Sequence, residues 1–95
     1  MDKEKNLLIK AMEECGKITQ YCSKAIKFGL FSHHPNEHTT NGGKILTKYY
    51  YLQAIIEELQ RNHVLPVYSK SYIDALKRDA IHKTKNTNKI NKKYK

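Results

Sequence analysis

A row of charged and aromatic side chains in the first third of the chain has a spacing that suits phosphate binding. Glu14, Lys17, Tyr21 and Lys24 follow one another at steps of three, four and three residues, and Lys27 extends the row. In a helix this spacing places the side chains on one side. An ammonium group can contact a phosphate directly, and a tyrosine ring can stack on a base. The row is therefore a candidate site for a phosphorylated ligand.

Histidine and cysteine offer two other kinds of chemistry. His33, His34 and His38 lie close together in one segment, but no C-x-x-C pair accompanies them, so we expect no metal site. These histidines are expected to face solvent or to shape the mouth of a pocket. Cys15 and Cys22 are two helical turns apart, roughly 10 Å along the axis, which is too far for a disulfide. Both are predicted to be reduced core residues.

No catalytic motif for hydrolysis or phosphate transfer stands out. The chain has no G-x-S-x-G string and no glycine-rich phosphate loop. The run Tyr49, Tyr50 and Tyr51 could suggest a platform for single-stranded nucleic acid, but neighbouring side chains on a helix point about 100° apart. We expect Tyr49 in the core, Tyr50 partly exposed or at an interface, and Tyr51 facing a pocket.

Positive charge is concentrated at the C-terminal end. The 95 residues carry 18 Lys and Arg against 9 Asp and Glu, a formal net charge of +9. Residues 83–95 hold six of the lysines and no acidic residue, which leaves +3 for residues 1–82. We expect a helical domain over 1–83 and a basic, flexible tail over 84–95. The tail is either a solvated terminus or an arm that binds phosphates without sequence preference.

Apolar periodicity predicts the elements that must position the candidate site. A helix is expected over 2–28, with Asp2 near its start and Gly29 after its end. Its apolar stripe is Leu8, Ala11, Cys15, Ile18, Cys22 and Ala25, widened by Met12 and Ile26. Residues 30–42, with Pro35, read as a loop.

Two more helices follow the loop. One is expected over 43–62, before the break at HVLPVY, and its apolar stripe is Ile45, Tyr49, Leu52, Ile56 and Leu59. The next is expected from Ser71, with Asp74 completing a capping box, to about Lys83.

The expected fold is therefore all-α, with two long antiparallel helices and a shorter third. Because a single small chain leaves apolar surface uncovered, we expect a homo-oligomer, a dimer or tetramer, that completes a four-helix-type bundle. No apolar stretch is long enough to span a membrane and no signal peptide is evident, so the expected location is the cytoplasm.

Several strings of this sequence resemble the MazG-like all-α nucleoside triphosphate pyrophosphohydrolases, in particular the small phage-type members. They are LLIKAMEECGKITQYCSKAIKFGL, HHP, TTNGGKIL and LQAIIEEL, in order over roughly residues 6–60. The resemblance implies that the positions corresponding to the family's four metal ligands are 14, 17, 48 and 51. This chain has Glu14, Lys17, Lys48 and Tyr51 there, so three of the four carboxylates are missing.

The altered positions favour a pseudo-enzyme without metal or cofactor that binds a nucleotide without cleaving it. The resemblance and the lysines together give seven candidate ligand-binding residues: Glu14, Lys17, Tyr21, Lys24, Lys27, Lys48 and Tyr51. In a phage, such a protein could sequester a cyclic-nucleotide immune signal in the host cytoplasm. The alternatives are a protein-interaction or inhibitor module on the same fold, a nucleic-acid-binding protein acting through its basic tail and the row of lysines, or a residual pyrophosphohydrolase.

Overall fold

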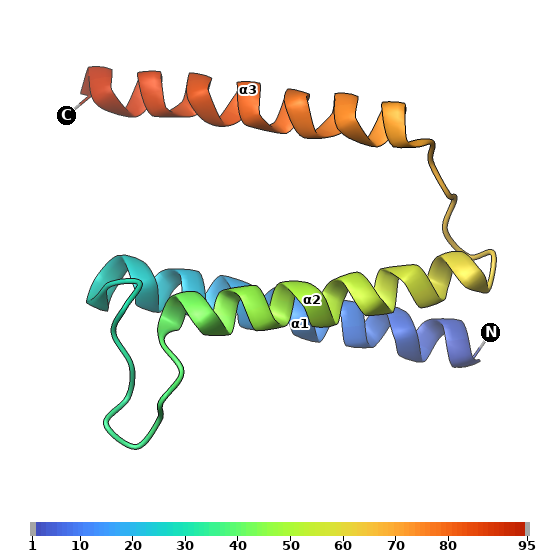
Figure 1. Ribbon diagram of the computed structural model, residues 1–95, viewed down its shortest axis with the longest axis horizontal. Coiled ribbons are helices and arrows are strands. Elements are labelled where there is room, and N and C mark those ends of the chain that lie inside the picture. The colour runs from blue at the N-terminus through green and yellow to red at the C-terminus, as the bar shows by residue number, and fades with distance from the viewer. Residues whose placement is uncertain (1, 95) are drawn as a thin grey trace.

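The computed structural model describes the backbone of residues 2–94 and the side chains up to residue 85. It contains three helices, α1 (Asp2–Phe28), α2 (Asn41–Arg61) and α3 (Lys70–Tyr94). Helices α1 and α2 form an antiparallel hairpin, while α3 lies apart from both (Figure 1). The described residues contain no strand, so the all-α fold is confirmed, and α1 has the predicted bounds.

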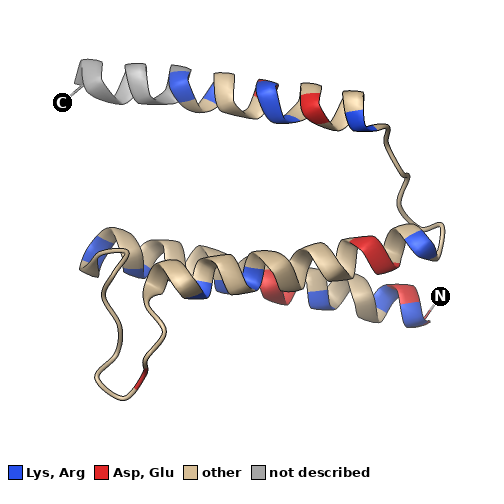
Figure 2. Cartoon of the chain, in the orientation of Figure 1, with Lys and Arg blue, Asp and Glu red and all other residues tan. Residues whose placement is uncertain are grey.

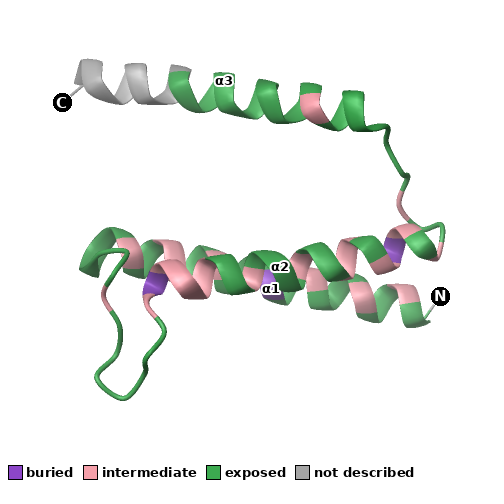
Figure 3. Ribbon diagram, in the orientation of Figure 1, coloured by how far each residue is buried: buried purple, intermediate pink, exposed green. Residues whose placement is uncertain are grey.

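The two hairpin helices meet along a seam of regular three- and four-residue steps. In α1 the seam positions are Leu7, Ala11, Glu14, Ile18, Tyr21 and Ala25. In α2 they are Ile45, Lys48, Leu52, Ile55 and Leu59. This spacing keeps one side of each helix against its neighbour over several turns. Among the described side chains only Leu59 is a fully buried apolar residue, so the single chain has almost no core (Figure 3).

The observed seam differs from the predicted one because each helix is rotated about its own axis relative to the prediction. Cys15, predicted to lie in the core, is exposed, and Tyr49 is 46% exposed. The cause is that α1 carries two adjacent stripes of side chains, about 100° apart around the helix. The predicted stripe mixed residues of both, and only some of them, such as Ala11 and Ile18, belong to the stripe that meets α2. The other stripe, with Leu8 and Cys15, remains largely outside the hairpin.

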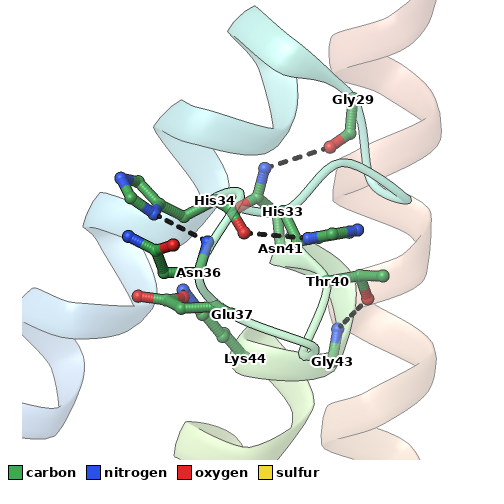
Figure 4. A network of polar contacts seen from close by, with 9 residues as sticks. All are labelled: Gly29, His33, His34, Asn36, Glu37, Thr40, Asn41, Gly43 and Lys44. Atoms are coloured by element: carbon green, nitrogen blue, oxygen red, sulfur yellow. Dashed lines mark hydrogen bonds and ion pairs between the residues drawn. The ribbon is translucent and has the colours of Figure 1, made fainter.

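The turn between α1 and α2 is fixed by a small polar network (Figure 4). Gly29 has a φ of 103°, in the left-handed region that suits glycine, as its place after α1 predicted. Buried Asn41 donates from Nδ2 to the Gly29 carbonyl at 3.1 Å, and its backbone N–H donates to Ser32 at 2.9 Å. The Thr40 hydroxyl caps α2 by accepting from Gly43 N–H at 3.1 Å.

Replacing Asn41 with alanine is expected to lower the free energy of unfolding by about 1–3 kcal/mol. The substitution removes the side-chain donor of the Gly29 carbonyl, which keeps only the longer 3.3 Å bond from the Ser32 N–H in a partly buried turn. Chemical denaturation followed by circular dichroism measures the loss. Asn36→Ala in the exposed part of the same loop is the control and should change stability by less than about 0.5 kcal/mol. Equal effects of the two substitutions would contradict a structural role for Asn41.

The segment between α2 and α3 is tied back onto the end of α2. The Leu59 carbonyl accepts from the backbone N–H groups of Val64 and Leu65 at 2.9 and 3.3 Å. The Gln60 side chain donates to the Pro66 carbonyl at 3.1 Å. These bonds set the direction in which the chain leaves the hairpin.

Helix α3 begins and ends at residues that differ from the prediction. Ser69, rather than Ser71, accepts the N–H of Tyr72 at the helix start. The helix has 25 residues and is not shorter than α2, because no glycine or proline after Lys83 interrupts it. The predicted flexibility of 84–95 concerns mainly residues 86–95, whose side chains lie outside the described part, and it stays a prediction. No described helix is apolar over a length that could cross a bilayer.

Candidate functional site: a lysine-rich face of the hairpin

Glu14 is a buried carboxylate held between two lysines. It lies in the seam of α1, where its residue is 8% exposed. Lys48 of α2 reaches it across the seam, with 3.4 Å between Nζ and Oε2, and Lys17 places its Nζ 3.9 Å from Oε1. Glu14 and Lys48 thus form a charge pair at positions where a helical hairpin normally has apolar side chains.

The Glu14 carboxylate is not fully satisfied by these contacts. Its buried Oε2 accepts no hydrogen bond, because the Lys48 ammonium lies near it at ion-pair distance without hydrogen-bond geometry. Lys48 also lies over the Tyr51 ring, 4.5 Å from its centroid. A cation above an aromatic face is attracted to the electron density of the ring. One ammonium group therefore lies close to both a carboxylate and an exposed ring.

A second lysine cluster lies two turns further along α1. The Tyr21 ring has Lys24 Nζ at 5.8 Å and Lys44 Nζ at 5.4 Å from its centroid. Lys44 also forms an ion pair with Glu37 in the loop (Figure 4). Sequence reasoning missed Lys44 and Glu37. A usable signal for Lys44 was its position four residues before Lys48, one turn away on the same helix.

A pocket of about 310 Å³ opens beside this second cluster. Its lining combines both lysines with the loop and the start of α2: Lys24, Phe28, Ser32, His33, His34, Pro35, Glu37, Asn41 and Lys44. His33 and His34 thus line a pocket and are also exposed, which agrees with both placements expected for the loop histidines. The volume lies at the lower end of the range typical of small-molecule sites, and the mix of ammonium groups and an aromatic ring suits a planar anionic ligand.

The structure brings six of the seven predicted site residues into these two neighbouring clusters. Lys27 is the exception, because its ammonium group lies over the Phe28 ring, 5.3 Å from the centroid. The clusters lie along the α1–α2 hairpin, and both of its helices carry Lys or Arg at several positions (Figure 2). They contain four lysines, Lys17, Lys24, Lys44 and Lys48, and two carboxylates, Glu14 and Glu37, so the face carries excess positive charge.

The donor set favours anion binding over metal chemistry. Within the described side chains, no group of three or more His, Cys, Asp or Glu residues is placed to hold a metal ion. Lys17, Lys48 and Tyr51 supply two ammonium donors and a ring at this site, beside the single carboxylate of Glu14. The arrangement can neutralise phosphate oxygens and stack against a base.

Comparison with known proteins adds no assignment: no protein family, no curated protein and no solved structure matches the chain.

Proposed function

We propose that the lysine-rich face binds a nucleotide without hydrolysing it. The observation that carries the proposal is the convergence of lysines from two helices on Glu14 and on Tyr21, which provides ammonium groups and rings side by side. The two clusters are seven residues apart along α1, about 10 Å. That separation allows a phosphate group to lie at one cluster and a base at the other.

The resemblance to the MazG-like pyrophosphohydrolases supports the nucleotide part of the proposal. In those enzymes carboxylates hold Mg²⁺, which binds the phosphates and activates water. Here Lys17 and Lys48 would contact the phosphates directly, so binding would need no metal and no water would be activated. We include in this proposal the sequestration of a cyclic-nucleotide signal by a phage protein in its host's cytoplasm, since retention without cleavage suits that role.

Binding without turnover is expected in a thermal-shift experiment with linear and cyclic nucleotides. A ligand present at 100 times its dissociation constant should stabilise the fold by about 2.7 kcal/mol. The shift should be the same in EDTA as in Mg²⁺, and it should fall as salt is raised, because lysines and phosphates attract each other electrostatically. The same nucleotides should be recovered uncleaved after incubation with Mg²⁺ or Mn²⁺.

Two results would overturn this proposal. A shift that requires Mg²⁺, with release of pyrophosphate at about 1 s⁻¹ or faster, would indicate an enzyme. The absence of any shift with nucleotides, together with a shift with oligonucleotides, would instead favour nucleic-acid binding.

A further inference from the structure

The side of the hairpin away from the lysines has an apolar stripe that the described residues leave largely uncovered. On α1 it repeats at alternating steps of four and three residues: Leu8, Met12, Cys15, Thr19, Cys22 and Ile26. Met12 is 73% and Ile26 88% exposed. An apolar groove of about 420 Å³ joins this stripe to α2 through Ile45. A stripe with this spacing is typical of a surface that packs against another helix.

Helix α3 carries a second uncovered apolar stripe. Tyr72, Ile73, Leu76 and Ala80 share one side of the helix, and all four are exposed. In the described part of the chain α3 packs against neither hairpin helix (Figure 1). The hydrogen bonds of Val64 and Leu65 to Leu59 hold the start of the connecting segment at the end of α2, and α3 runs back along the hairpin without packing on it (Figure 1). Most of the stability of a helix in a protein comes from the packing of its apolar side, so α3 needs a packing partner.

The accessible surface of the chain indicates how large an interface with a partner it needs. The whole chain exposes 8032 Å². A compact monomer of 11.1 kDa is expected to expose about 5,700 Å², so the excess is about 2,300 Å². The excess is still about 1,000 Å² when the last ten residues are counted as fully exposed chain. A standard interface buries about 800 Å² per partner, and obligate homodimers bury more.

We propose that the uncovered stripe of the hairpin is the docking surface for a second copy of this chain, whose α3 packs on it in exchange. A second copy is the occupant because it supplies the matching element, an unpartnered α3, and because the exchange covers both stripes in both chains. The lysine-rich face remains open, since it lies on the other side of the hairpin. This proposal stands independently of the nucleotide proposal.

The wild-type protein tests the assembly directly. Light scattering at micromolar concentration should give at least twice the 11.1 kDa of one chain. The urea midpoint, followed by circular dichroism, should rise with protein concentration because folding and association are coupled. A mass of one chain, with a midpoint independent of concentration up to about 100 µM, would overturn the proposal and assign the face to a different partner.

Two variants test the exchange. Leu76→Glu on α3 and Met12→Glu on α1 should each raise the dissociation constant at least tenfold. Arg78→Gln on the opposite side of α3 makes the same change in net charge as either variant and should leave the constant within twofold. If the Leu76→Glu variant associates as strongly as the wild type, the proposed exchange of α3 is overturned.

A cross-linking experiment covers the case in which a variant is unfolded at every concentration. The concentration dependence of the wild-type midpoint then still decides whether the chain assembles, and covalent trapping of the two chains decides whether α3 is exchanged. For that test, Leu76→Cys in one tagged chain should cross-link to Cys15 or Cys22 of another, and cross-linking only within one chain would overturn it.

Discussion

Replacing Lys48 with alanine is expected to lower the free energy of unfolding by about 2–3 kcal/mol. Lys48 is the closer of the two cations beside Glu14, and its side chain is only 18% exposed. Its removal leaves a buried carboxylate with one distant, half-exposed partner, and an uncompensated buried charge is strongly destabilising. Chemical denaturation at one fixed protein concentration measures the loss.

A control and a rescue accompany this variant. Lys17→Ala should cost less than about 1 kcal/mol, since Lys17 is 46% exposed and 3.9 Å from the carboxylate. The double variant Glu14→Leu/Lys48→Leu should be at least as stable as the wild type, because both positions lie in an otherwise largely apolar seam and apolar replacements of buried ion pairs are often neutral or stabilising. If Lys48→Ala is as stable as the wild type, the proposed stabilising role of the buried Glu14–Lys48 pair is contradicted.

The second large effect concerns ligand affinity. Lys17→Glu and Lys24→Glu should each weaken the binding of a nucleotide such as ATP by about 1–3 kcal/mol, and by more than the corresponding alanine variants. Charge reversal removes an ammonium contact and adds repulsion of the phosphate. Both side chains are exposed enough for the fold to tolerate the change. Isothermal titration calorimetry in EDTA measures the affinity.

Lys10→Glu is the matched control for these charge reversals. Lys10 lies on α1, pairs with Glu13 at 3.5 Å and belongs to neither lysine cluster. It undergoes the same change in charge and should alter the affinity by less than about 0.5 kcal/mol, which corresponds to weak, screened electrostatics. If all three reversals weaken binding equally, the ligand senses only the net charge of the chain. If Lys17→Glu and Lys24→Glu bind as the wild type does, the ligand lies elsewhere.

Periodicity predicted the helices of the hairpin better than the way they face each other. Asp2 and Gly29 correctly bracketed α1, since a left-handed glycine has a local signature. The seam was wrong at Cys15 and Tyr49, because α1 and α2 each present two apolar stripes. Only the partner helix decides which stripe is inside the chain. The charged pair at the seam also hid the correct register, since Glu14 and Lys48 do not look like core residues.

The part of the site that helical spacing alone brings together could be predicted from the sequence. The part that depends on the conformation of the loop could not. Glu14, Lys17, Tyr21 and Lys24 follow from the period of α1. The pairing of Lys44 with Glu37 depends on how residues 29–40 fold back, which involves the Asn41 bonds and has no periodic signal.

The carboxylate between Lys17 and Lys48 makes Glu14 an internal competitor for any anion that enters. A singly charged ligand would only replace the attraction that the Glu14 carboxylate already provides for the two lysines. A ligand with several negative charges would attract the lysines more strongly than Glu14 does. We therefore expect the face to rank anions by valence, with chloride and acetate bound poorly and polyphosphates well. Such a threshold would keep the lysines unoccupied among the abundant small anions of a cell.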